Sequence, residues 1–189
     1  MYLPGYVVSV IVIFIMNHAS ANVFIANYVF NWLDTNKDCV KNYLRRAAAG
    51  RVPNAYAAYV LGTLYLTGEG LKKDLGKAEY FIRMAANFGS PEAINSLGDG
   101  CYSGDICEKN TLKALEYYEK GAKLGYGPAQ FNAGIVLLKY MPKTKNNLRK
   151  AVFYLDKASK NSNDLGEMTE SALQYKKDAQ KELAACKKV

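Results

Sequence analysis

The chain has 189 residues, of which half are hydrophobic and only five are proline, and this composition excludes a disordered tail. The length is sufficient for one domain with its own core. The formal net charge of +8 at pH 7 favours an acidic partner, which could be an acidic protein, an anionic lipid surface or another polyanion. A basic surface that meets only water is the alternative.

The chain begins with the pattern of an export signal. Residues 6–16 form an apolar run that is too short to span a bilayer, because a spanning helix needs about 20 residues. Ala19 and Ala21 follow as a small-residue cleavage site. We expect residues 1–21 to be a signal peptide; an uncleaved anchor and a buried first helix are the alternatives. The protein would then be periplasmic or secreted, without a nucleic-acid partner, and in contact with a membrane only if residues 1–21 stay attached.

Sequence repeats with a period of 36 residues occupy the middle of the chain, and a fixed period of this size is typical of repeat architectures. The third copy has one extra residue in its middle. We expect the three repeats at residues 54–89, 90–125 and 126–163. Positions that recur are Ala57, Ala93 and Ala129; Gly62, Gly98 and Gly134; Ala78 and Ala114; Gly89 and Gly125.

Each repeat predicts two helices joined by a turn. In the first repeat the helices are expected at 54–66 and 75–87, because apolar residues recur there at intervals of three and four. Asp74 is placed to cap the second helix, and Asn110 and Asn147 occupy the same position in the next two repeats. Gly89 and Gly125 are expected to end the second helices.

The two ends of the array are irregular, as repeat arrays require. Residues 22–53 predict a degenerate N-terminal hairpin, in which Thr35 and Asp38 have the spacing of a capping box. Residues 164–189 predict a C-terminal capping helix, expected over 167–188. Its apolar face would contain Met168, Ala172, Tyr175, Ala179, Leu183 and Cys186.

The motif of the first repeat resembles the Sel1-like repeat, a relative of the tetratricopeptide repeat. The residues that carry the resemblance are Ala57, Leu61, Gly62, Tyr65, Gly68, Gly70, Leu71, Asp74, Lys77, Ala78, Ala85, Ala86 and Gly89. The second repeat keeps most of them, whereas the third loses the glycine turn to "YMPKTKNN". The resemblance implies an all-α, right-handed α-solenoid that holds protein partners and leaves the partner open.

Two of the four cysteines are expected to pair. Cys101 and Cys107 bracket the turn of the second repeat, at positions that pack close together in the fold that the resemblance implies. A disulfide is one interpretation, and two small buried side chains are the other. Cys39 and Cys186 lie near opposite ends of the array, too far apart to pair within one straight chain.

The sequence does not predict a catalytic site of the common kinds, namely a histidine-activated nucleophile, a histidine-ligated metal or a phosphate-binding loop. The single histidine, His18, lies inside the expected signal peptide, so the mature chain would have no histidine-based nucleophile or metal site. No cofactor motif is present: the turn "TGEG" has neither a preceding strand nor the Gly-Lys-Ser/Thr ending of a phosphate loop. The alternative is an enzyme of the β-lactamase or penicillin-binding kind, which one cysteine-rich subgroup of the resembling family suggests.

The best candidate site is the groove that the first helix of each repeat would line in this fold class. Its surface would change from aromatic through polar and acidic to apolar. The residues are Tyr56, Tyr59 and Thr63, then Glu92, Asn95 and Asp99, then Phe131, Ile135 and Leu138. The last three could instead be core under the C-terminal helix. We therefore expect a non-catalytic scaffold that binds another protein in this groove; an immunity protein against a secreted effector is a further alternative within the family.

Overall fold

The computed structural model describes residues 55–69, 71–161 and 168–186, and every regular element in them is a helix. The expected signal peptide and the expected hairpin at 22–53, with Thr35, Asp38 and Cys39, lie outside the described residues. The helices are α4 (Ala55–Thr67), α5 (Leu75–Asn87), α6 (Pro91–Ser103), α7 (Thr111–Lys123), α8 (Gly127–Lys139), α9 (Lys145–Lys160) and α11 (Met168–Ala185).

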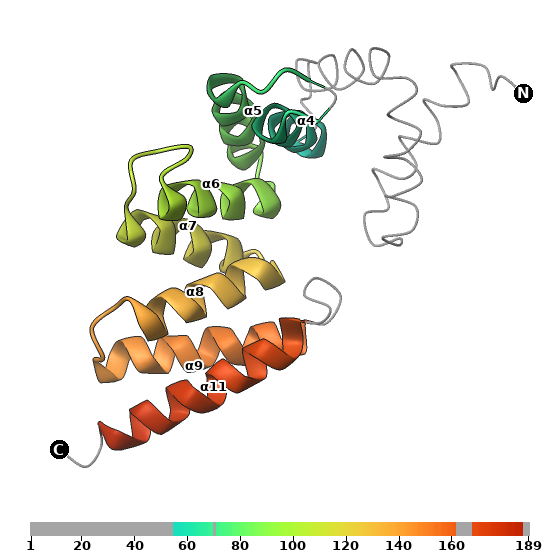
Figure 1. Cartoon of the computed structure of the whole chain (residues 1–189). Coiled ribbons are helices and arrows are strands. Elements are labelled where there is room, and N and C mark those ends of the chain that lie inside the picture. Colours follow the sequence, from blue (N-terminus) through green and yellow to red (C-terminus); the bar gives the residue numbers. More distant parts are fainter. Residues whose placement is uncertain (1–54, 70, 162–167, 187–189) are drawn as a thin grey trace, which may run out of the picture.

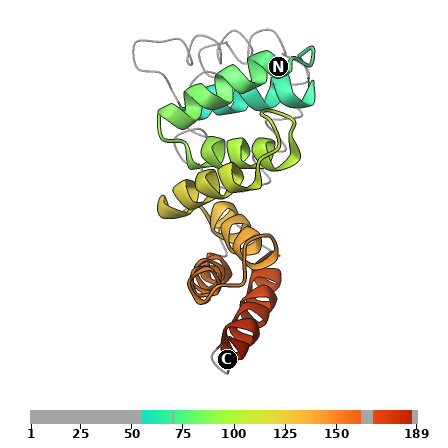
Figure 2. The ribbon, with the colours of Figure 1, turned by 90° about the vertical axis from the view of Figure 1, so that its left-hand side faces the viewer.

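The helices pack as sequential pairs, which stack one on another in chain order (Figure 1). The pairs are α4–α5, α6–α7 and α8–α9, and α11 packs against α9 as the last layer (Figure 2). Their buried apolar side chains form three clusters, each shared by neighbouring helices. A single pair has no partner for its outer apolar face, and the stacking therefore supplies the core. The all-α solenoid architecture predicted from the repeats is confirmed.

The recurring glycine of the first helix, which follows a leucine in the first two repeats and an alanine in the third, is explained by how the two helices of a repeat meet. A Cβ atom on Gly62 would lie 2.7 Å from the Ile82 side chain, too close for two carbon atoms. The equivalent glycines of the next two repeats receive side chains in the same way. These further contacts are Gly98 with Tyr118 and Gly134 with Leu155. The glycine therefore lets a large side chain of the second helix lie directly on the backbone of the first.

Two of the three predicted N-caps are confirmed. The carboxylate of Asp74 accepts the backbone N–H of Lys77 at 3.0 Å, and Asn110 caps α7 in the same way. The prediction for Asn147 was wrong, because α9 begins earlier and its cap is Thr144. The Thr144 hydroxyl accepts the N–H of Asn147 at 3.2 Å, so Asn147 lies in the first turn of the helix.

The predicted glycine ends of the second helices are confirmed. Gly89 has φ +84° and Gly125 has φ +89°, values that disfavour any residue with a side chain. The next helix starts almost at once, because Ser90 accepts the N–H of Ala93 and Pro91 occupies the first turn of α6. The short connection places each repeat directly against the one before it.

The C-terminal helix covers the end of the array. Ala172 and Ala179 of α11 are fully buried, and Tyr175 is half-buried against the core. Leu183 and Cys186 pack against the same core, as the predicted apolar face requires. Met168 is an exception, because it lies in the first turn of α11 and is exposed.

Candidate functional site: the first-helix face

The surface formed by α4, α6, α8 and α11, called the first-helix face below, contains the residues predicted for partner binding. Tyr56 is 38% exposed, the highest fraction among the aromatic residues predicted for the groove. Tyr59 and Thr63 are half-buried, and the Thr63 hydroxyl donates to the Tyr59 carbonyl at 3.0 Å within α4. The aromatic end of the predicted site is therefore available to a partner mainly through Tyr56.

The apolar end of the predicted site is covered. Phe131 is 9% exposed and Leu138 is 3% exposed, and both belong to the core that α11 completes. The Phe131 ring lies 6.1 Å from the ring of Tyr175, measured between centroids. Ile135 is half-buried in the same cluster. Of the two interpretations left open for these side chains, the described residues show the one in which the C-terminal helix folds over them.

The polar middle of the face is a hydrogen-bonded cluster around Asp99. The Asp99 carboxylate accepts from Asn95 at 2.9 Å, from the Tyr118 hydroxyl at 2.8 Å and from Asn132 at 3.3 Å. Asn132 also donates to the Asn95 side chain at 3.2 Å. Helices α6, α7 and α8 thus meet at one carboxylate, which joins two successive repeats.

Partial burial changes the ionisation of this cluster. It raises the pKa of the Asp99 carboxyl above its usual range, and the hydrogen bond from Tyr118 acts in the opposite direction. Burial, followed by the negative charge of Asp99, raises the pKa of the Tyr118 hydroxyl. The phenol therefore stays protonated and keeps donating to the carboxylate at physiological pH.

Sequence reasoning placed Asn95 and Asp99 on this face and missed Tyr118, Asn132 and Ser96. Two of these residues, Ser96 and Asn132, could have been found from the repeat, because they occupy the same position in successive copies. Ser96 and Asn132 are 36 residues apart, and each reaches back to the preceding first helix: Ser96 approaches the Tyr59 hydroxyl at 3.5 Å, and Asn132 contacts Asn95. Tyr59 and Asn95 are themselves 36 residues apart. One pair of repeat positions therefore connects successive first helices.

A first cleft lies between the first and second repeats. Its volume is about 540 Å³, and Asp99 is among the residues that line it. Lys73 and Leu75 come from the turn and helix start of the first repeat, and Tyr102 and Ile106 come from the end of α6 and the turn after it. The cleft combines charges of both signs with apolar side chains, which is typical of sites that bind a polypeptide segment.

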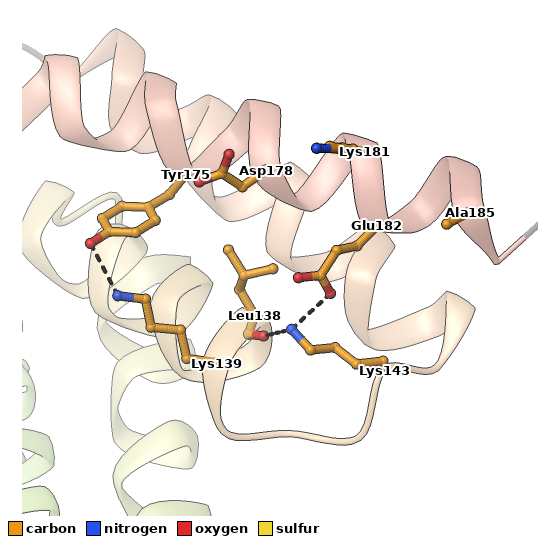
Figure 3. A pocket seen from close by; sticks show the side chains of 8 residues that line it. All are labelled: Leu138, Lys139, Lys143, Tyr175, Asp178, Lys181, Glu182 and Ala185. Atoms are coloured by element: carbon orange, nitrogen blue, oxygen red, sulfur yellow. Dashed lines mark hydrogen bonds and ion pairs between the residues drawn. The ribbon is translucent and has the colours of Figure 1, made fainter.

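A second cleft of about 460 Å³ lies on the same face, between α8 and α11 (Figure 3). The Lys139 ammonium donates to the Tyr175 hydroxyl at 3.0 Å and lies 4.4 Å from the centre of that ring. Lys143 pairs with Glu182 at 2.8 Å and also donates to the Leu138 carbonyl. The cleft is thus fixed by contacts between the last repeat and the capping helix, and sequence reasoning missed it.

The predicted disulfide is confirmed. Cys101, at the end of α6, is bonded to Cys107 in the following turn, so the open interpretation of two separate buried side chains is replaced. The bridge closes the turn that forms one wall of the first cleft, beside Ile106. Cys186 is a half-buried free thiol. A disulfide is the state expected in an oxidising compartment.

The arrangement is suited to binding. Among the described residues, no group of three or more histidine, cysteine, aspartate or glutamate side chains lies close enough together to hold a metal ion. The carboxylate with a raised pKa, Asp99, accepts three hydrogen bonds, one from its own helix α6 and two that tie it to α7 and α8. No helix within the described ranges is both long and apolar enough to cross a membrane.

Stacked helix pairs with clefts between successive first helices define the class of helical-repeat scaffolds. The model of the Sel1 repeat matches residues 55–89, 91–126 and 127–163, which together make up more than half of the chain. The chain therefore belongs to the Sel1 repeat family. This result confirms the resemblance drawn from the sequence motifs.

Solved structures support the same architecture. A Sel1 repeat protein from Oxalobacter formigenes is similar with a TM-score of 0.56 and 24% identity, over 75% of this chain and 98% of that one. A protective antigen present in uropathogenic Escherichia coli strains, which displays an SLR fold, is similar with a TM-score of 0.55 and 18% identity, over 78% of this chain and 38% of the antigen. At these identities the similarity shows the fold alone.

Two curated proteins are similar in sequence. An uncharacterized protein of Neisseria meningitidis serogroup B is 33% identical over 93 residues, which are 49% of this chain and 20% of that protein. Chitin synthase regulatory factor 3 of Schizosaccharomyces pombe is 27% identical over 129 residues, 62% of this chain and 14% of the factor. The chain thus spans a fifth or less of the length of these relatives.

Proposed function

We propose that this protein is a non-catalytic scaffold that binds another protein along its first-helix face. The observation that carries the proposal is the presence of two clefts, of about 540 and 460 Å³, on this one face. An extended segment of a partner that crosses the intervening step between α6 and α8 could occupy both. The exposed Tyr56 ring at one end and Lys139 at the other would frame its path.

The charge of the face suggests the orientation of that partner. The first cleft is lined by one lysine and two aspartates, including Asp99, whereas the second is lined by three lysines together with Asp178 and Glu182, so the charge balance is acidic at the first cleft and slightly basic at the second. A partner segment with acidic side chains would therefore be held at the α8–α11 end, which agrees with the acidic partner predicted from net charge. The family relationship supports protein binding in general and does not identify the partner.

We further propose that the protein acts outside the cytoplasm, in the periplasm or the secreted fraction. The Cys101–Cys107 disulfide supports this location, because such bonds persist in oxidising compartments. The N-terminal residue of the protein recovered from its own cells tests the proposal. Asn22 as the first residue would mean release after cleavage, whereas an intact Met1 would mean that the apolar run is retained.

The binding proposal is tested by capturing partners from the envelope and secreted fractions of the parent cell with the full chain as bait. The variant combines Tyr56→Glu and Lys139→Glu on the first-helix face. The matched control combines Tyr80→Glu and Lys123→Glu, which are exposed on α5 and α7. We expect one protein to be enriched by the wild type and the control and lost by the variant. Equal capture by the variant and the control would contradict the proposed face.

A further inference from the structure

The outward side of α9 carries an unusual combination of side chains for a helix in a repeat. The buried residues of α9 are Leu148, Ala151, Tyr154, Leu155 and Ala158. The exposed residues are Lys145, Asn146, Arg149, Lys150, Phe153, Lys157 and Lys160. At the helical repeat of 3.6 residues, all seven fall within an arc of roughly 140°. This basic stripe, called the α9 stripe below, lies opposite the side that packs on the core.

Half of the net positive charge of the protein is concentrated here. Between Lys145 and Lys160, the bounds of α9, the chain has five basic residues and one acidic residue, Asp156, so this helix carries four of the eight net charges. The second helices of the other repeats are more balanced: α7 has three lysines and two glutamates. α9 is therefore the most strongly basic of the second helices.

The ion pairs within the described residues leave much of this charge uncompensated. Lys150 pairs with Glu119 at 3.1 Å, and Lys160 pairs with Asp156 at 2.7 Å. Lys145 and Arg149 have no acidic partner within 4 Å among the described residues. Their charges therefore act outward, on whatever approaches the stripe.

An exposed phenylalanine lies in the middle of the stripe. Phe153 is 53% exposed, and the Lys157 ammonium lies 4.6 Å from the centre of its ring. The Phe153 ring meets the Tyr154 ring in a T-shaped arrangement, with 5.4 Å between the centroids. The Phe153 ring therefore packs against Tyr154 and exposes apolar surface between Arg149 and Lys157. These two residues lie one helical turn before and one helical turn after Phe153.

We propose that the α9 stripe docks the protein onto the surface of an anionic lipid bilayer. Summed charge attracts basic side chains to anionic headgroups without a fixed geometry, and the aromatic tip would enter the boundary between headgroups and acyl chains. A protein partner fits less well, because lysine is depleted and arginine enriched at protein interfaces, whereas four of the five basic side chains here are lysine. The contact uses α9, the second helix of the third repeat, and leaves the first-helix face free for the partner proposed above.

The experiment measures binding of the full chain to vesicles that contain phosphatidylglycerol and to vesicles of phosphatidylcholine alone, at low and high salt. The variant combines Lys145→Glu, Arg149→Glu and Lys157→Glu. The matched control combines Lys72→Glu, Lys109→Glu and Lys123→Glu, which change the net charge equally at exposed positions on other elements. Since all forms share residues 1–21, the apolar run contributes equally to each.

We expect the wild type and the control to prefer the phosphatidylglycerol vesicles and the stripe variant to lose that preference. A basic side chain near an anionic surface contributes about 1 kcal/mol, which corresponds to roughly a fivefold change in partitioning for each charge lost. High salt should remove the preference of the wild type as well. A second variant, Phe153→Ser, should weaken binding about tenfold and leave the salt dependence unchanged.

Three results would overturn the proposal. The first is a wild type without preference for the anionic vesicles at low salt, and the second is an equal loss in the stripe variant and the control, which would assign binding to net charge. The third is capture of an acidic protein by the stripe while vesicles are ignored. Unchanged binding of Phe153→Ser would refute the role of the ring as an anchor.

Discussion

Gly98→Ala tests whether the recurring glycine of the first helix is needed because a side chain of the second helix packs directly on it. The added Cβ atom would lie 2.5 Å from Cε1 and 2.7 Å from Cδ1 of Tyr118, whereas carbon atoms in favourable contact are about 3.5 Å apart. The ring would have to retreat by roughly 1 Å. Its hydroxyl is held by Asp99 at 2.8 Å, so the movement also strains the cluster that connects α6, α7 and α8.

The expected magnitude follows from opposing effects. Overpacking a buried site costs about 1–3 kcal/mol, and partial loss of a hydrogen bond to a carboxylate adds about 1 kcal/mol. Alanine has a better helix propensity than glycine by about 1 kcal/mol, which acts in the other direction. We therefore expect Gly98→Ala to lower the free energy of unfolding by about 2 kcal/mol.

Urea unfolding followed by circular dichroism measures this change, and Gly76→Ala is the matched control. Gly76 lies in the first turn of α5, where a Cβ atom would meet only the Asp74 carboxylate at an ordinary 3.5 Å. That substitution should leave stability unchanged or raise it by up to about 1 kcal/mol. A double-mutant cycle with Tyr118→Ala should remove most of the cost at Gly98, because the obstructing ring is gone. Gly98→Ala at or above wild-type stability would refute the packing argument.

Three further outcomes are expected from the same unfolding assay. Reduction of the wild type, or Cys101→Ser with Cys107→Ser, should cost about 2 kcal/mol in the chain-entropy model, and a reducing agent should then have no effect on the double variant. Thr144→Ala should cost about 1 kcal/mol as a lost helix cap, visible as a lower midpoint with an unchanged slope. The ammonium groups of Lys160 on α9 and Lys176 on α11 hold the pKa of Asp156 below its usual range. These contacts of Asp156 therefore stabilise the fold above the unfolded pKa of about 3.9, and the stabilisation is lost as pH falls through the folded pKa. Asp156→Asn should therefore make the free energy of unfolding depend less on pH in the acid range.

What the sequence could predict is what a single repeat determines. The second helix of the first repeat was predicted at residues 75–87, and α5 has these bounds, because its cap, apolar spacing and terminal glycine are all local signals. The Cys101–Cys107 pairing was one of two interpretations, based on two positions that bracket one turn and pack close together in the fold that the resemblance implies. Periodicity then extended these local results to a stack of helix pairs.

What the sequence could not predict depends on contacts between repeats. The position of Tyr118 over α6 depends on how α7 crosses it, so the three-helix cluster at Asp99 was missed. Whether Phe131 and Leu138 face solvent depends on where α11 lies, and their own spacing is the same in either case. The predicted binding residues therefore divide into exposed and covered ones only once the last helix is placed.

The third repeat shows which parts of the repeat motif are constrained by packing. The turns of the first two repeats use Gly68 and Gly104 at positive φ, whereas α8 ends at Tyr140 with φ −118°. In the turn between α8 and α9 a side chain closes the loop instead: the Asn147 amide donates to the Pro142 carbonyl at 3.0 Å.

Gly134 is nevertheless retained, since a Cβ atom there would lie 2.5 Å from Leu155. A turn can be rebuilt from other residues at the surface, but at this position the Leu155 side chain already fills the space between the two helices and leaves none for a Cβ atom. The packing glycine is thus the stronger mark of a repeat than the turn glycines. The divergent turn places Lys143 beside α11, where its pair with Glu182 at 2.8 Å forms one side of the second cleft. The turn that lacks the glycines therefore supplies part of the second cleft.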